Sequence, residues 1–404
     1  MNKSKHKTKR LFPTVGRDLA TAKITLATAL LLFLVSCGGG KKPDSKFPFG
    51  RVEIQALSGS ACVAPSYIAK ELGFFEREGI DVTLVGGDFE SNKLGLSTGQ
   101  FPVANGDYGF FPAAYNGLDI KLVAGLHQGC IQVLAPPGSD IRTAADLAGK
   151  RIGIDEIGGS PMAVTSVLLA NSGIDPQKGV TWIPFPRDIL PTIADKSKEV
   201  DAVALWDPWG PLAVKRGYTL LCDISTHPLF AGKYCCFIFA SGQYVKEKPE
   251  LIRAILRAYR RASEWIAANP EETAKIVVEK DYVASSDTAL ITQLIVNYRY
   301  HSRHGHAEKA QARDDALYFS RELKKTGFLP ADLDPEKFVE HFYFDVFGDD
   351  DVFDDGDNGA HAVRDTVNVH PADTPDADKQ AAGKPDRPDD KSSKSNKPLG
   401  HGQE

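Results

Sequence analysis

The sequence of 404 residues has little of several features that define large classes of proteins. It lacks a basic excess, because 48 Lys and Arg stand against 53 Asp and Glu, whereas a nucleic-acid-binding domain normally carries a basic patch. It lacks the repeated apolar runs of ~20 residues that a multi-span membrane protein needs. No glycine-rich phosphate loop ending in Lys-Ser or Lys-Thr is present, which argues against an ATPase. The composition is that of a globular protein long enough for two or three compact units.

One apolar run stands out, at residues 24–35. Residues 1–23 before it are basic, and Ser36, Cys37 and three glycines follow it. As a helix this run would rise only ~18 Å, too little for the ~30 Å hydrocarbon layer. The pattern therefore predicts an export signal. A buried core helix is the alternative, but no polar face or cap supports it.

The residues Leu34-Val35-Ser36-Cys37 resemble a bacterial lipoprotein signal. The resemblance implies that residues 1–36 are a signal peptide and that Cys37 carries the lipid. The protein would then lie in the cell envelope, anchored to a membrane and facing the periplasm or the exterior. Residues 37–49, rich in Gly, Lys and Ser, would form a flexible tether.

The other end of the chain is acidic and rich in proline. Residues 348–404 lack the apolar residues needed to offset ordering entropy, so they are predicted to be a disordered acidic tail. A divalent-cation loop at 349–355 is the alternative, but the carboxylates lack a calcium-loop spacing.

Strand and helix patterns alternate between residues 50 and 347, which predicts an α/β fold. Strands separated by helices imply parallel βαβ units. Strand patterns occupy residues 52–57, 80–87, 120–126, 131–137, 151–156, 180–185, 201–206, 219–224 and 235–241.

The second α/β unit interrupts the first, which predicts two lobes joined by two hinge strands. We expect the crossings near Val133–Pro137 and Cys236–Ala240. The predicted lobes are 50–134 with 238–347, and 135–237, each a sheet flanked by helices. A ligand in such a molecule lies between the lobes, at strand ends and helix N-termini.

Four stretches then resemble one family in order: APSYIAKELGFFEREGIDVTLV, DLAGKRIGIDEIGGSP, DAVALWDPWGPLA and WIAANPEE. They are similar to the substrate-binding proteins of ABC importers of the nitrate/sulfonate/taurine and thiamine-precursor type. The resemblance implies a type II periplasmic-binding-protein fold and a monomer that captures a small solute without chemistry. It also implies delivery to a permease and an ATPase on other chains. The solute stays open among anionic, heterocyclic and sulfur-containing compounds.

Eight residues are candidates for holding that solute. Hydroxyls and backbone N–H groups at helix starts suit an anion, whereas a Trp beside a carboxylate suits a flat or cationic ligand. Tight turns and helix capping are the alternative explanations. The candidates are Ser58, Ser60, Asn105, Tyr108, Gly159, Ser160, Trp206 and Asp207.

Five cysteines besides Cys37 form the least usual feature of the sequence. The fold hypothesis brings Cys62, His127 and Cys130 into the cleft, together with Cys235 or Cys236. Adjacent residues of a strand face opposite sides, so only one of the last two is expected there. Three hypotheses remain open: a disulfide such as Cys62–Cys130, buried free thiols, or a copper, zinc or iron site of His127, Cys62, Cys130 and Cys236.

Two weaker alternatives concern function. Tyr234-Cys235-Cys236-Phe237 partly resembles the cysteine-rich strand of an iron-dependent enzyme that makes the thiamine pyrimidine, but the export signal argues against that activity. A sensory or docking protein is the other alternative. His301, His304 and His306 are interpreted as a solvated helix end rather than a metal site.

Overall fold

The computed structural model describes residues 46–300 and 306–348. The predicted signal peptide, Cys37, most of the tether, the tail beyond Gly348, and His301 and His304 lie outside the described residues. Among the helices in the described ranges, none is long and apolar enough to cross a bilayer.

Two five-stranded sheets organise the chain, in the orders β2-β1-β3-β10-β4 and β7-β6-β8-β5-β9. We call the part built on the first sheet lobe 1 and the part built on the second lobe 2. The strands are β1 Arg51–Leu57, β2 Asp81–Gly87, β3 Val103–Gly106, β4 Ile120–His127, β5 Ile131–Ala135, β6 Arg151–Ile154, β7 Thr181–Pro184, β8 Ala202–Trp206, β9 Thr219–Asp223 and β10 Cys236–Ser241.

Helices fill the connections between strands and most of the chain after β10. The α-helices are α2 Ala64–Glu71, α3 Phe74–Arg77, α4 Phe89–Thr98, α5 Phe110–Tyr115, α6 Ser160–Asn171, α7 Leu190–Thr192, α8 Trp209–Lys215, α9 Gly242–Glu247, α10 Pro249–Ala268, α11 Pro270–Glu279, α12 Thr288–Tyr298, α13 His306–Thr326 and α14 Pro335–Phe342. Two short 3-10 helices are η1 Ala61–Val63 and η2 Ala144–Leu147, and η3 Ile193–Ser197 is a π-helix.

Both sheets are mixed. They contain the parallel strands that the sequence predicts and, in addition, antiparallel strands that it does not predict. Strands β1, β2 and β3 are parallel, but β10 runs antiparallel to both β3 and β4. In the second sheet β5 is antiparallel to β8 and β9. Strands β5 and β10 are the first strands after the chain changes sheets. Each is antiparallel to both of its neighbours.

The chain passes from the first sheet to the second between β4 and β5, and returns between β9 and β10. The first passage comprises residues 128–130 and the second residues 224–235. These passages lie just before the predicted crossings, while the exact lobe boundaries stay a prediction. We call the two segments the crossings.

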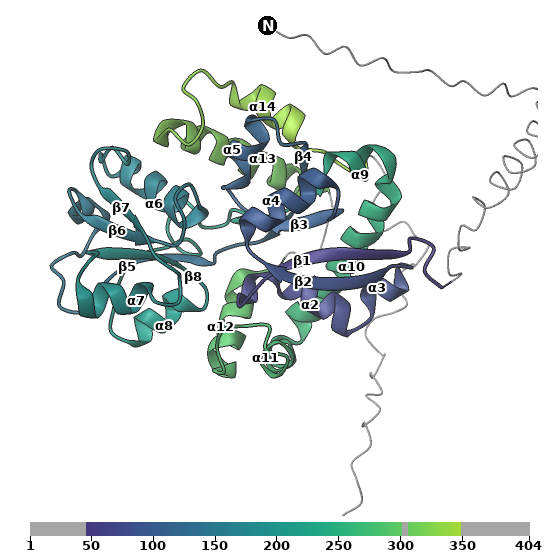
Figure 1. Ribbon diagram of the computed structural model, residues 1–404, viewed down its shortest axis with the longest axis horizontal. Coiled ribbons are helices and arrows are strands. Elements are labelled where there is room, and N and C mark those ends of the chain that lie inside the picture. The colour runs from purple at the N-terminus through teal and green to yellow at the C-terminus, as the bar shows by residue number, and fades with distance from the viewer. Residues whose placement is uncertain (1–45, 301–305, 349–404) are drawn as a thin grey trace, which may run out of the picture. The chain divides into compact units, whose positions relative to one another are not determined.

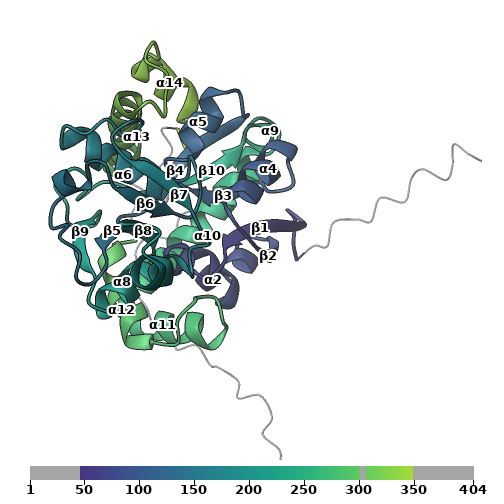
Figure 2. The ribbon, with the colours of Figure 1, turned by 60° about the vertical axis from the view of Figure 1, so that its left-hand side comes forward.

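Helices pack against both sheets. In Figure 1, α2, α3 and α10 gather beside β1 and β2, and α6, α7 and α8 surround the second sheet. In the views of Figures 1 and 2, α11 lies beside α12 and α13 beside α14. Helix α10 begins at Pro249 and buries one face along its length, with Leu251, Ile255, Tyr259 and Ile266 at helical spacing.

An aromatic cluster forms the centre of lobe 1. Phe239 of β10 is fully buried and stacks on Phe110, with ring centroids 4.6 Å apart. Phe237, Phe111 and Phe342 surround this pair. Because β10 carries this core at its middle and Cys236 at its start, the packing of the core fixes where the cysteine lies.

Candidate functional site

Four side chains from separate segments meet at one buried point: Cys62, His127, Cys130 and Cys236. One ligand-type atom from each lies within 4.8 Å of all the others, and all four residues are buried. Cys62 lies in η1, His127 ends β4, Cys130 ends the first crossing, and Cys236 begins β10. We call these residues the cysteine site.

Local structure explains how each side chain reaches the site. The Ser60 side chain caps η1 by accepting from the backbone N–H of Cys62, and its hydroxyl lies 3.0 Å from the Cys62 Sγ. His127 pairs with Cys236 across the β4–β10 ladder. Gly129 has φ +66°, and a Cβ there would lie 2.5 Å from Ser225, so this position requires glycine for the turn before Cys130.

Cys236 is one of the four residues of the cysteine site, and Cys235 contacts two of the others without belonging to the set. The Cys130 Sγ lies 3.5 Å from the Cys235 Sγ and 3.7 Å from the Cys236 Sγ. The alternation of faces applies within a regular strand, but β10 begins only at Cys236, and its register with β4 is irregular there. Cys235 therefore lies outside the strand whose geometry the prediction assumed.

The five cysteines in the described part of the chain are free thiols. The structure thus does not contain the Cys62–Cys130 disulfide that was one of the sequence hypotheses. Cys222 is also buried but belongs to β9 in lobe 2, outside the cysteine site.

The cysteine site favours positive charge. Burial alone would lower the pKa of His127, but the charges of Cys236 and Cys235 raise it well above its usual range. Burial alone would raise the pKa of Cys235, but hydrogen bonds from Cys130 and Cys236 and the charge of His127 lower it. Since the imidazole is the cation that balances a thiolate here, a bound metal cation could take over that role.

One nitrogen of His127 is available to a ligand. Its Nδ1 lies 3.3 Å from the carbonyl oxygen of Gln128 and 3.6 Å from the Cys235 Sγ. Its Nε2 is buried and has no hydrogen-bond partner among the residues that the structure describes. A neutral His with Nδ1–H on a backbone carbonyl presents Nε2 as the usual metal-binding atom.

Asp207 of lobe 2 grips the loop that carries Cys62. Its carboxylate accepts from the Ser60 hydroxyl at 2.6 Å and from the Ala61 backbone N–H at 2.7 Å. Burial, and next the charge of Cys62, raise the pKa of Asp207 to about 7. Two of the predicted ligand residues, Ser60 and Asp207, therefore bind each other across the lobes.

Trp206 is held by the protein itself. It is 1% exposed, its Nε1–H donates to the Asp155 carboxylate at 2.9 Å, and its ring lies 5.1 Å from that of Phe89. The Trp206 ring, a predicted ligand contact, thus packs against Phe89 of lobe 1.

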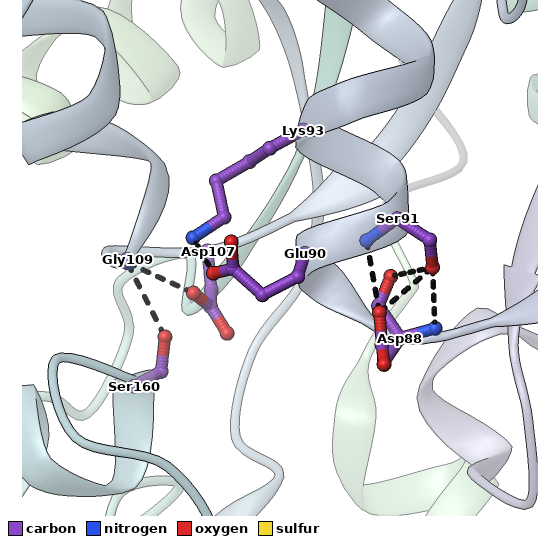
Figure 3. A network of polar contacts seen from close by, with 7 residues as sticks. All are labelled: Asp88, Glu90, Ser91, Lys93, Asp107, Gly109 and Ser160. Carbon is purple, nitrogen blue, oxygen red and sulfur yellow. Dashed lines mark hydrogen bonds and ion pairs between the residues drawn. The ribbon is translucent and has the colours of Figure 1, made fainter.

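A further contact between the lobes joins the turn between β3 and α5 to the start of α6. The Gly109 backbone N–H donates to the Asp107 carboxylate at 2.9 Å and lies 3.3 Å from the Ser160 Oγ (Figure 3). Gly159 occupies the N-cap position of α6, so Ser160 is the first helical residue and not the cap that the alternative of helix capping would make it. Its hydroxyl is therefore available to the other lobe.

The remaining predicted ligand residues bond to neighbours in lobe 1. The Asn105 side chain donates to the Ser66 Oγ at 3.1 Å, and the Tyr108 hydroxyl donates to the Tyr234 carbonyl at 3.1 Å. The Ser58 Oγ accepts from the Gly87 N–H at 3.1 Å. Each of these three side chains thus has a hydrogen-bond partner within the protein.

An open hollow of about 450 Å³ lies where β2 and α4 face lobe 2. Sequence reasoning did not single out its lining, which is Asp88, Glu90, Asp155, Glu156, Pro186, Arg187 and Asp188. Asp155 and Glu156 directly follow β6, so the rule that ligands bind beyond the carboxyl ends of strands could have identified them. Five carboxylates against one guanidinium make the hollow unfavourable for an anion.

A cavity of about 240 Å³ borders the cysteine site from the other side. It is lined by Cys130 and Asp207 and by residues of α8 and α12, including Val214, Leu294 and Tyr298. Cys130 is the residue of the cysteine site that lines this cavity.

Asp107 should make stability depend on pH. Burial raises its pKa to about 7 from 3.8, opposed by hydrogen bonds from Ser160 and Gly109; the charge of Cys62 adds to the increase and Lys93 reduces it. The folded state then binds the proton more tightly than the unfolded state, so stability falls as pH rises from about 4 to 7. Between pH 5 and pH 8 this loss amounts to about 2–3 kcal/mol, and we expect Asp107→Asn to remove it, as measured by urea unfolding at the two pH values. Equal pH slopes in both proteins would contradict this assignment.

Comparison with known proteins agrees with this geometry. A protein of Brucella abortus named as a candidate binding protein is 25% identical over 218 residues, which cover 52% of this chain and 66% of the relative. The chain thus spans just under two thirds of that relative's length. YtlA of Bacillus subtilis, also named as a candidate binding protein, is 23% identical over 262 residues, covering 62% of this chain and 75% of YtlA.

Solved structures share the fold. The alkanesulfonate-binding protein SsuA of Xanthomonas axonopodis pv. citri, bound to MOPS, superposes with a TM-score of 0.58 at 19% identity, over 69% of this chain and 94% of SsuA. The periplasmic nitrate-binding protein NrtA of Synechocystis gives 0.60 at 16%, over 72% and 86%. The ligand-binding component of an ABC-type import system from Staphylococcus aureus, with zinc bound, gives 0.58 at 14%, over 73% and 97%. The α/β periplasmic-binding-protein fold expected from the sequence is thereby confirmed.

The family described as NMT1/THI5 like matches residues 60–273. That range begins at Ser60, contains both crossings and all four residues of the cysteine site, and ends within α11. Because the match covers more than half of the chain, this protein belongs to the NMT1/THI5-like family.

Proposed function

We propose that this protein is the extracytoplasmic solute-binding subunit of an ABC importer. The observation that carries the proposal is the pair of lobes, joined by two crossings and fastened together at Asp207, with a buried group of ligand-type side chains beside the crossings. Fold neighbours named for binding sulfonate and nitrate in the periplasm support it.

In this role the protein captures a solute and performs no chemistry on it. Hinge opening would admit the solute, and closure would bury it under the Asp207 contact. A permease and an ATPase on other chains would receive it. The resemblance of Leu34–Cys37 to a lipoprotein signal supports a lipid anchor on Cys37 that keeps the protein at the membrane.

The test is a thermal-shift screen of the mature chain. A solute that binds only the folded protein raises its stability in proportion to ln(1 + [L]/Kd), which is about 2.7 kcal/mol at 100 Kd. We expect at least one compound among sulfonates, nitrate, pyrimidines, flavins, thiols and metal ions to raise Tm dose-dependently. If none does, and no small molecule copurifies, the transport proposal fails and a sensory or docking role replaces it.

A further inference from the structure

We propose that Cys62, His127, Cys130 and Cys236 bind one thiophilic d¹⁰ metal ion, Zn(II) or Cu(I), and that this ion is the solute the lobes enclose. The second half of this inference rests on the proposed transport function. Its first half rests on the cysteine site alone.

The spacing of the donors fits tetrahedral coordination. With metal–sulfur bonds of ~2.3 Å, two sulfurs on a tetrahedral ion lie about 3.8 Å apart. The Cys130 and Cys236 Sγ atoms lie 3.7 Å apart. The widest donor pair lies within 4.8 Å, so binding requires the donors to contract by no more than about 1 Å.

The chemistry of the donors selects the ion. Three sulfurs and one imidazole suit Zn(II) or Cu(I), whereas Mg²⁺ and Ca²⁺ require oxygen ligands. The buried Nε2 of His127, without a hydrogen-bond partner in the described part of the chain, is the independent sign that a ligand is expected here. A buried polar atom of this kind costs free energy unless it is paired.

Neighbouring groups are placed to orient the donors. The carbonyl oxygen of Gln128 lies beside the His127 Nδ1, and the Ser60 hydroxyl lies 3.0 Å from the Cys62 Sγ. Cys235 contacts both Cys130 and His127 but falls outside the four-donor set. These are the contacts that hold metal ligands in the binding orientation.

The location of the site explains why the ion would be cargo. Two donors lie at the ends of the crossings, and Cys62 lies on the loop that Asp207 grips from lobe 2. All four residues are buried, and Cys130 borders the cavity lined by α8 and α12, so separation of the lobes would widen the path of an ion to the site. Loading would therefore be linked to closure.

The experiment titrates the reduced, chelator-treated mature chain with Zn(II), and in a separate arm with Cu(I), against a colorimetric competitor. We expect one ion per chain, bound more tightly in one arm than the other, and a decrease in radius of gyration by X-ray scattering on loading. Co(II) in place of Zn(II) should give tetrahedral d–d bands and a thiolate charge-transfer band. Cys62→Ser and Cys236→Ser should each weaken binding at least 100-fold and lower that charge-transfer band.

Two matched cysteine variants sharpen the result. Cys222→Ser changes a buried free cysteine of β9 and should leave affinity unchanged. Cys235→Ser removes a neighbour of the donors and should weaken binding about 10–100-fold while the one-to-one stoichiometry stays. Circular dichroism checks that each variant folds.

Several outcomes would overturn the inference. Affinity that is unchanged in Cys62→Ser and Cys236→Ser would place any bound ion elsewhere, and no binding in either arm would remove the site. An ion bound without compaction would not be an enclosed solute. An organic solute that stabilises wild type and Cys62→Ser equally, with no metal bound, would end this inference while leaving the transport proposal standing.

Discussion

Asp207→Ala is expected to lower the free energy of unfolding by about 2–4 kcal/mol, because the Ser60 hydroxyl and the Ala61 N–H each lose a buried acceptor. Both donors lie on the loop that carries Cys62, so the loop should also lose its attachment to lobe 2. Urea denaturation followed by tryptophan fluorescence measures the first effect, and an increased radius of gyration measures the second.

Asp207→Asn is the matched control. Its side chain has the same shape, its oxygen can accept from Ala61 and its NH₂ can donate to the Ser60 oxygen. Because burial raises the pKa of Asp207 to about 7, the acid is about half ionised at pH 7, and at pH 5, where it is mostly neutral, the amide is its closest match. We expect a change within about 1 kcal/mol. If Asn and Ala are equally destabilising, the hydrogen bonds are not what fastens the lobes.

Phe239→Ala is expected to cost about 3–5 kcal/mol, the range for removing a fully buried aromatic ring. The ring is 0% exposed and stacks on Phe110, so its removal leaves a cavity in the centre of lobe 1. Since β10 also carries Cys236, the variant should loosen the cysteine site. Denaturant unfolding and thiol accessibility to a maleimide reagent are the two measurements.

Phe344→Ala provides the comparison at an exposed position. That ring is 39% exposed, so its loss should change stability by about 0.5 kcal/mol or less. Comparable losses in the two variants would show that the aromatic cluster around Phe239 does not form the centre of the core.

Local patterns in the sequence predict most strands to within a few residues. The patterns at 52–57, 151–156 and 235–241 correspond to β1, β6 and β10. They do not give strand direction, because hydrophobic alternation is the same in parallel and antiparallel ladders. The sequence predicts a crossing near β10, but the antiparallel direction of this strand against β3 and β4 comes from the structure.

The sequence predicted which residues form the cysteine site, but it did not predict the hydrogen bonds around them. Cys62, His127 and Cys130 were expected together because each lies at a strand end or crossing, and the structure brings them together. The bond between Ser60 and Asp207 joins residues 147 positions apart, and no local pattern encodes it. Cys235 contacts Cys130 and His127 although it is not among the four donors, because β10 begins one residue after it and strand alternation does not apply to it.

The stretch from β5 to β9, residues 131–223, contains the whole second sheet and none of the four donors. Lobe 2 therefore contacts the site through Asp207, whereas all four donors belong to other parts of the chain. Substitutions on its outer surface could accumulate without altering a single donor atom. The donor set and the surface of lobe 2 would then be free to diverge independently.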